Sequence, residues 1–204
     1  MFTGIIQETG KVADLKRRQG DLILTLEAPK TCGSLAIGGS VAVNGCCLTA
    51  VEVSPPRFTV EAVPETLTKT DFESLRMGDV VNLEQPVRMN DLLGGHLVSG
   101  HVDALAEVTR VVPEGGGVRM GVRLPGRLKK YVVEKGSVAL DGISLTVAAL
   151  TAEGIEVALI PHTLEATNLS RKKPGSRLHV EADLLAKHLE KLTEAYQGAE
   201  RHAH

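Results

Sequence analysis

The chain repeats itself once, and this repeat restricts its possible folds more than any other feature. Residues 39–49 (GSVAVNGCCLT) return as residues 136–146 (GSVALDGISLT), with seven of eleven positions identical at a shift of 97. Other pairs at this shift are 63–67 with 160–164, Gly78 with Gly175, and Glu84 with Glu181. Nearly all of residues 1–97 is echoed in residues 98–186. Two copies of this length predict two tandem domains, since a solenoid stacks three or more shorter units.

Each copy consists of short β-branched segments separated by glycine and proline, which is typical of strands. In the first copy these segments are 21–27, 40–43, 48–53, 57–63 and 80–84. Asn44-Gly45 and Asp141-Gly142 are typical of hairpin turns. About six short strands per copy, with little helix between them, predict an all-β fold of two small closed barrels. Residues 66–75 and 163–170 are each expected to form one helical turn or a loop.

The segments outside the repeat differ from it in amino-acid composition. Residues 85–95 are rich in proline, asparagine and glycine and are expected to link the two barrels. Residues 184–196 contain no glycine or proline, and Leu185, Leu189, Leu192 and Tyr196 recur at helical spacing. An isolated helix of this length is marginal in water, so its apolar stripe is expected to dock either on its own barrel or on another subunit. Residues 198–204 are expected to be frayed.

Composition excludes several classes of function. The net charge of -2 and the aromatic content of 2% argue against a nucleic-acid-binding surface. No apolar run approaches the roughly 20 residues of a membrane span, and the first residues lack the pattern of a signal peptide. The three cysteines are odd in number and form no CxxC pair, so neither a disulfide framework nor a zinc site is expected. This cysteine usage fits the cytoplasm.

Comparison of the two copies identifies candidate polar positions. Cys46 is matched by Ile143, so Cys46 is expected to face the core as a small apolar residue. Cys47 is matched by Ser144, and neighbours on a strand point to opposite faces. Each copy therefore presents a short polar row, Cys47 with Thr49 and Ser144 with Thr146. These rows either face a ligand or are ordinary solvent-facing strand positions.

In the second copy His101 replaces Gly4, and it lies within a glycine-rich stretch, residues 94–103, that also holds His96. Glycines allow the backbone to approach a ligand closely. A metal pair is not expected, because a spacing of five suits neither a helix face nor a strand face and no third ligand is evident. His101 is either a hydrogen-bonded structural residue or a catalyst. No phosphate loop, Rossmann fingerprint or nucleophile elbow is present.

Four motifs together resemble the riboflavin synthase family of the α-chain type. They are residues 1–6, 44–49, 94–101 and 141–146, in unbroken order over a match that runs from Met1 to about Asp183. The resemblance implies two six-stranded Greek-key barrels, at residues 1–97 and 98–186, each binding lumazine. It also implies a C-terminal helix and tail at residues 187–204 through which three copies form a homotrimer.

The implied reaction is a dismutation of two 6,7-dimethyl-8-ribityllumazine molecules. One donates a four-carbon unit to the other, which gives riboflavin and 5-amino-6-ribitylamino-uracil in the last step of riboflavin biosynthesis, without metal or organic cofactor. The working site lies between the N-terminal barrel of one subunit and the C-terminal barrel of its neighbour. Holding two like rings together supplies much of the rate, and acid–base help of about 10²–10⁴ then suffices. Association with a separate lumazine synthase is left open.

The resemblance also implies site residues. Catalytic roles fall on Phe2, Cys47, His101, Ser144 and Asp183, with Ser144 and His101 as a polar pair that assists proton removal or attack; which side chain is the base stays open. Asp183 is also expected to cap the C-terminal helix. Substrate contacts in the first copy are Gly4, Ile5, Ile6, Cys47, Leu48, Thr49, Glu61, Ala62, Val63, Pro64, Glu65 and Thr66. Those in the second copy are Gly100, His101, Val102, Lys135, Ser144, Leu145, Thr146, Ala158, Leu159, Ile160, Pro161, His162 and Thr163.

Within these sets, residues 61–66 and 158–163 are expected to be strands that hold the heterocycle through backbone groups. Lys135 is expected either to be a surface lysine or, by the resemblance, to reach the neighbouring subunit's substrate. The chain departs from some family members at Val43 and His162. The main rival function is a non-enzymatic lumazine or flavin carrier of the same family. A flavin-binding barrel of a reductase would need a nicotinamide domain, for which residues 98–204 carry no motif.

Overall fold

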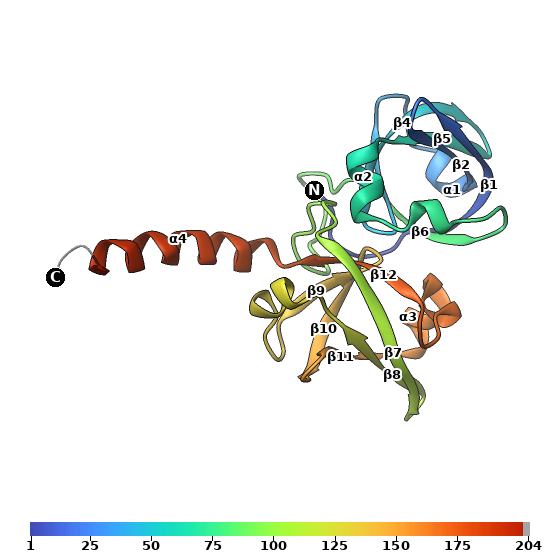
Figure 1. The fold of residues 1–204 in the computed structure, drawn as a ribbon. Coiled ribbons are helices and arrows are strands. Elements are labelled where there is room, and N and C mark those ends of the chain that lie inside the picture. Colours follow the sequence, from blue (N-terminus) through green and yellow to red (C-terminus); the bar gives the residue numbers. More distant parts are fainter. Residues whose placement is uncertain (202–204) are drawn as a thin grey trace.

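The computed structural model describes residues 1–201, and the side chains of residues 1–193. It consists of two closed six-stranded antiparallel barrels followed by a long helix (Figure 1). The strands of the first barrel are β1 (Glu8–Arg18), β2 (Asp21–Glu27), β3 (Ser40–Val43), β4 (Cys46–Ser54), β5 (Arg57–Ala62) and β6 (Val80–Glu84). Those of the second are β7 (Ala104–Glu114), β8 (Gly117–Arg123), β9 (Ser137–Leu140), β10 (Ile143–Leu150), β11 (Gly154–Leu159) and β12 (Arg177–Ala182). The predicted pair of six-stranded barrels is confirmed.

The two barrels share one strand order. Around the first barrel the order is β1-β2-β5-β4-β3-β6, and the second runs through the equivalent strands in the same cyclic order. Each barrel encloses its own apolar core, with Leu24 and Phe58 at the centre of the first and Met120 and Ile155 at the centre of the second. The repeat in the sequence is therefore a repeat of complete structural units.

The predicted hairpin turns are present and meet each other at the junction of the barrels. Asn44 and Gly45 have φ of 45° and 78°, and Asp141 and Gly142 have φ of 45° and 79°, as a two-residue hairpin turn requires. A methyl group added at Gly45 would lie 2.6 Å from the backbone nitrogen of Gly142. Glycine at these turns therefore serves both the turn conformation and the close approach of the barrels.

A buried network of polar side chains connects the two barrels at the same junction. Asn82 on β6 donates from Nδ2 to the Asp141 carbonyl and to Asn168 Oδ1, both at 3.0 Å. Asn168 in turn donates to Asn44 Oδ1 at 3.1 Å, and His179 Nδ1 lies 2.9 Å from the Asn44 carbonyl oxygen. Because these buried groups satisfy one another across the interface, the two barrels are held in one relative orientation.

Short helices close the barrel ends. They are α1 (Pro29–Cys32), α2 (Pro64–Lys69), η1 (Phe72–Ser74), η2 (Gly126–Tyr131), α3 (Pro161–Ala166) and η3 (Asn168–Arg171). The prediction of strands over 61–66 and 158–163 is wrong in its second half, because β5 ends at Ala62 and β11 at Leu159. Proline starts α2 and α3, since its fixed φ suits the first helical position and its missing N–H is not needed there.

The C-terminal helix α4 (Leu184–Arg201) projects away from both barrels (Figure 1). Asp183 caps it as predicted, since Asp183 Oδ1 accepts a hydrogen bond from the Leu185 N–H at 2.9 Å. An ion pair from Lys187 to Asp103 at 2.6 Å ties its first turn to the second barrel. The helix begins at Leu184, as the leucine spacing predicted, and runs beyond residue 196. Of the tail predicted to be frayed, residues 198–201 are helical, and residues 202–204 lie outside the described residues.

The apolar stripe of α4 faces solvent. Leu185, Leu189 and Leu192 are 60%, 61% and 60% exposed. The alternative in which this stripe docks on its own barrel is therefore wrong for these three leucines, while the Tyr196 side chain lies outside the described set. Within residues 1–201, no helix is both long enough and apolar enough to cross a membrane.

Candidate functional site

Strand alternation places the polar rows as the repeat predicts. On β4 the Cys46 and Leu48 side chains are buried in the barrel, whereas Cys47 is half-buried and Thr49 exposed on the other face. Strand β10 repeats this pattern with Ile143 and Leu145 inside and Ser144 and Thr146 outside. Burial raises the pKa of the Cys46 thiol to about 12, so Cys46 remains a neutral core residue. Since Leu48 and Leu145 point into the barrels, these two predicted contacts can reach a ligand only through their backbone.

The segment before each barrel's first strand crosses to the other barrel. The Ser144 N–H donates to the Gly4 carbonyl at 2.8 Å, and the Cys47 N–H donates to the Gly100 carbonyl at 2.8 Å. Ile6 accordingly packs against the core of the second barrel, and Val102 against the core of the first. Residues 4–6 therefore lie beside Ser144, and residues 100–102 beside Cys47. The repeat identifies these segments as equivalent but carries no sign of the exchange.

The crossing segments fit so closely that their glycines are required. Gly4 and Gly100 have φ of 76° and 84°, in the region that favours glycine. A methyl group added at Gly4 would lie 2.6 Å from Ser144 Cβ, and one added at Gly100 would lie 2.6 Å from Cys47 Cβ. These contacts set the backbone directly against the polar row of each barrel.

Two equivalent carboxylates hold the crossing segments. Glu84 accepts from the Thr3 N–H and hydroxyl at 2.7 Å each and from the Gly4 N–H at 3.0 Å. Glu181 accepts from the N–H and hydroxyl of Ser99 and the N–H of Gly100 at the same three distances. Burial raises the pKa of Glu84, and the hydrogen bonds from Thr3 and Gly4 oppose that effect. Sequence reasoning paired these glutamates by the shift of 97 but missed their role.

A cavity of about 240 Å³ lies at Cys47. It is lined by Cys46, Cys47, Glu65, Thr66, Lys69, Thr70, Gly100, His101 and Val102. The structure thus brings together Cys47, His101, the start of α2 and the crossing segment, all of which the sequence predicted as site residues. It adds Lys69, which ends α2, and Thr70, which follows it. Sequence reasoning expected a helical turn or a loop over residues 66–75 but named no site residue there beyond Thr66.

The equivalent place in the second barrel has a different side-chain arrangement. Ser144 Oγ lies 2.7 Å from His96 Nδ1, and His96 is only 8% exposed. Burial lowers the pKa of His96, while the negative charges of Asp183 and Glu181 oppose that effect. His101, which the resemblance pairs with Ser144, lies instead at the Cys47 cavity, so a single chain does not bring those two residues together. His96 was considered from the sequence only as a metal ligand, and its contact with Ser144 was missed.

Other predicted residues lie at different depths. Phe2 is fully buried between the barrels, pairs with Val98 and packs against Ala42 and Ala139. Lys135 is exposed with φ of 63°, and its N–H donates to the Val147 carbonyl at 2.8 Å. The Glu61 carboxylate pairs with Arg18.

The predicted contacts around the two short helices are mostly accessible. Strand β5 ends at Ala62, and strand β11 ends with Ala158 and Leu159. The residues that follow, Val63 and Ile160, are exposed. Pro64 and Glu65 begin α2, and Pro161, His162 and the half-buried Thr163 begin α3. Ala62 and Leu159 belong to the barrel cores, whereas Ile5 is exposed, and Glu65 and Thr66 line the Cys47 cavity.

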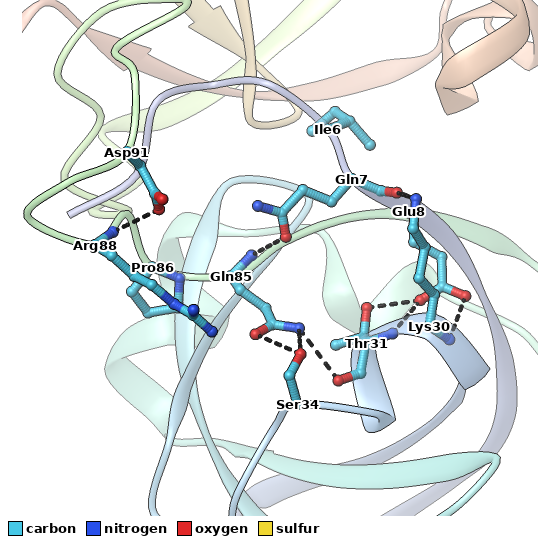
Figure 2. A pocket seen from close by; sticks show the side chains of 10 residues that line it. All are labelled: Ile6, Gln7, Glu8, Lys30, Thr31, Ser34, Gln85, Pro86, Arg88 and Asp91. Atoms are coloured by element: carbon cyan, nitrogen blue, oxygen red, sulfur yellow. Dashed lines mark hydrogen bonds between the residues drawn. The ribbon is translucent and has the colours of Figure 1, made fainter.

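A larger cavity of about 420 Å³ lies elsewhere, between α1 and the start of the linker (Figure 2). Its polar groups bind one another: Gln85 donates to Ser34 Oγ and to the Thr31 carbonyl, and Glu8 accepts from the Thr31 N–H and hydroxyl. Figure 2 shows these side chains turned toward each other. Apart from Ile6, its lining contains no predicted site residue. Within the described residues, no cluster of three or more His, Cys, Asp or Glu has the geometry to hold a metal ion.

Comparison with known proteins decides the family. The lumazine binding domain model matches residues 3–86 and again residues 99–183. The chain is 40% identical to riboflavin synthase of Bacillus subtilis (strain 168) over 189 residues, which is 93% of this chain and 88% of that protein. It is 42% identical to riboflavin synthase of Mycobacterium bovis over 196 residues, covering 94% of this chain and 98% of the relative.

The chain belongs to the riboflavin synthase family. Its tandem barrels are the two lumazine-binding domains of that family, as the resemblance in the sequence predicted. Among solved structures, LumP complexed with riboflavin superimposes with a TM-score of 0.83 at 26% identity, covering 89% of this chain and 99% of LumP. LumP complexed with 6,7-dimethyl-8-(1'-D-ribityl) lumazine has a TM-score of 0.81 at 24% identity, with the same coverage, and supports the fold.

Proposed function

We propose that this chain catalyses the dismutation of two 6,7-dimethyl-8-ribityllumazine molecules to riboflavin and 5-amino-6-ribitylamino-uracil. The observation that carries the proposal is the pair of matching frames, each made of one buried glutamate, one crossing segment and one polar strand row. A reaction between two identical molecules needs two similar binding places. It also needs them to differ, because one molecule loses a proton and the other is attacked, and the Cys47 and Ser144 pockets differ in their side chains.

Two features support a homotrimer in which a neighbouring subunit completes each site. The Cys47 cavity of about 240 Å³ is smaller than the roughly 300–1,000 Å³ of usual ligand sites. The three exposed leucines of α4 form an apolar stripe that a second and third copy would cover. We assign lumazine binding to residues 1–97 and 98–186, and trimerisation to the helix and tail at residues 187–204.

In this assembly the Cys47 pocket of one subunit would face the Ser144 pocket of its neighbour. His101 and Ser144, which lie in different pockets of one chain, would then meet across the subunit boundary. Lys135 is exposed and available to reach the neighbouring substrate, and Asp183 lies where α4 leaves the second barrel. We propose that Phe2 acts by supporting the floor of both pockets. The three free cysteines support a reducing compartment, and we place the enzyme in the cytoplasm.

Turnover of the lumazine tests the proposal directly. The purified protein should consume 6,7-dimethyl-8-ribityllumazine and form riboflavin, followed by absorbance and by chromatography of both products, at a ratio of one riboflavin to two lumazines. A Cys47→Ala, Ser144→Ala double variant should bind more weakly and turn over more slowly, while Ser34→Ala in the unassigned cavity should match the wild type. Stable binding of lumazine without any riboflavin would instead identify a carrier.

A further inference from the structure

The contact between Ser144 and His96 is built into the backbone. The His96 N–H donates to the Thr3 carbonyl at 3.1 Å, which fixes the residue beside the crossing segment. A methyl group added at the preceding Gly95 would lie 2.1 Å from the Thr3 oxygen and 2.8 Å from Ser144 Cβ. Segment 94–96 therefore lies against Ser144 in one narrowly defined position, and the 2.7 Å distance between His96 Nδ1 and Ser144 Oγ follows from it.

The other ring nitrogen of His96 has no partner. Within the described part of the chain, Nε2 is the one buried side-chain nitrogen or oxygen that makes no hydrogen bond. If Nε2 carried the ring proton, a buried N–H would be unsatisfied; if Nδ1 carries it, Nε2 holds only a lone pair. Unpaired buried N–H groups are rarer than unpaired buried acceptors. We therefore assign the proton to Nδ1, which donates to Ser144 Oγ.

The Cys47 pocket lacks this arrangement. Gly100 lies over Cys47 as Gly4 lies over Ser144, but among the described residues no side chain makes a hydrogen bond to the Cys47 sulfur. Besides the cysteines, the ionisable side chains that line its cavity are Glu65, Lys69 and His101. The Ser144 hydroxyl of the second barrel is thus oriented by His96, whereas the Cys47 thiol of the first barrel has no such side-chain partner among the described residues.

We infer that His96 is a positioning residue that holds Ser144 Oγ from behind, so that the hydroxyl proton faces the ligand of the second barrel. This inference rests on the proposed function. When the C7 methyl C–H bond of a lumazine breaks, its proton passes to solvent water and its electron pair delocalises into the ring. A fixed O–H donor stabilises such charge best where it is oriented before the reaction. The lumazine in the Ser144 pocket is therefore the one that becomes the anion.

Four variants of His96 and Ser144 test the inference through kcat and KM for riboflavin formation. His96→Leu removes the donor and should lower kcat on the order of tenfold, with a smaller change in KM. His96→Asn places an amide N–H near the position of Nδ1 and should retain kcat within about threefold. His96→Gln reaches the position of Nε2 instead and should be as slow as His96→Leu. In a Ser144→Ala background, His96→Leu should have no further effect, because the histidine acts through the serine.

Two results would overturn the inference. One is a loss in His96→Leu, Ser144→Ala that equals the product of the two single losses. The other is a His96→Asn enzyme that melts at the wild-type temperature yet is as slow as His96→Gln, since that would make the imidazole a base. Thermal melting of every variant separates misfolding from these outcomes. Failure of the wild type to form riboflavin would refute the proposed function instead, so the two failures are distinguishable.

Discussion

Replacement of Gly100 by alanine tests whether the crossing segments define the two pockets. Gly100 has φ of 84°, and a methyl group there would lie 2.6 Å from Cys47 Cβ and 2.9 Å from Phe2 Cε2. The positive φ alone costs about 1 kcal/mol for alanine. Overpacking adds about 1–3 kcal/mol, and loss of the hydrogen bond from the Cys47 N–H adds about 1 kcal/mol. We expect a total loss of about 3–5 kcal/mol in the free energy of unfolding.

Gly78→Ala is the matched control, because Gly78 has φ of 90° but a methyl group there would meet open space. It should lose only the backbone cost of about 1 kcal/mol. Denaturant unfolding measures both values, and titration with a non-reacting lumazine analogue counts the sites. Gly100→Ala should weaken the Cys47 site and leave the Ser144 site, while Gly4→Ala should do the reverse. Equal stabilities of Gly100→Ala and Gly78→Ala would refute the reasoning.

Three further predictions concern the carboxylate frame, the buried histidine and the helix. Glu181→Gln turns an amide N–H toward the N–H of Gly100 and should destabilise the fold by about 1–3 kcal/mol in thermal or denaturant unfolding; an unchanged midpoint would contradict this role. Burial lowers the pKa of His96, so the folded state binds fewer protons at this residue than the unfolded state does. The contribution of His96 to the free energy of unfolding is therefore present above its ordinary pKa of 6.5 and is lost as pH falls. Denaturant unfolding at pH 7.5 and 5.5 should show a smaller difference in His96→Asn than in the wild type. Charging the stripe with Leu185→Glu and Leu189→Glu should yield monomers in analytical ultracentrifugation, and a trimer that survives both changes would exclude α4 as its contact.

Much of the molecule could be predicted from the repeat and from strand alternation. The period of two placed Cys46 inside and Cys47 outside, and the Asn-Gly and Asp-Gly pairs placed the turns, because both signals are local in the chain. The helix after Asp183 followed from leucine spacing and a capping carboxylate. The start of α2 at Pro64 was missed because the expected strand edge came from the family resemblance, although proline at a helix start is itself a local signal.

The site was less accessible to sequence reasoning. Glu84 and Glu181 were visible as a matched pair, yet their bonds to the crossing segments span more than 80 residues. His96 and Ser144 lie 48 residues apart, and no sequence pattern indicates that they are in contact. The predicted partnership of His101 with Ser144 is not met within one chain, because residues 98–102 cross to the first barrel.

The sequence by itself determined two six-stranded barrels, their turns, the polar face of each and the apolar stripe of the last helix. These features depend only on the spacing of residues along the chain, because strand and helix geometry place residues of a given spacing on the same face, whatever the distant residues are. The tertiary structure alone decided that the leading segments exchange barrels and that His96, rather than His101, lies on the Ser144 hydroxyl. Such contacts depend on how two closed surfaces meet, and glycines at 4, 95 and 100 permit an approach that side-chain spacing along the chain does not encode.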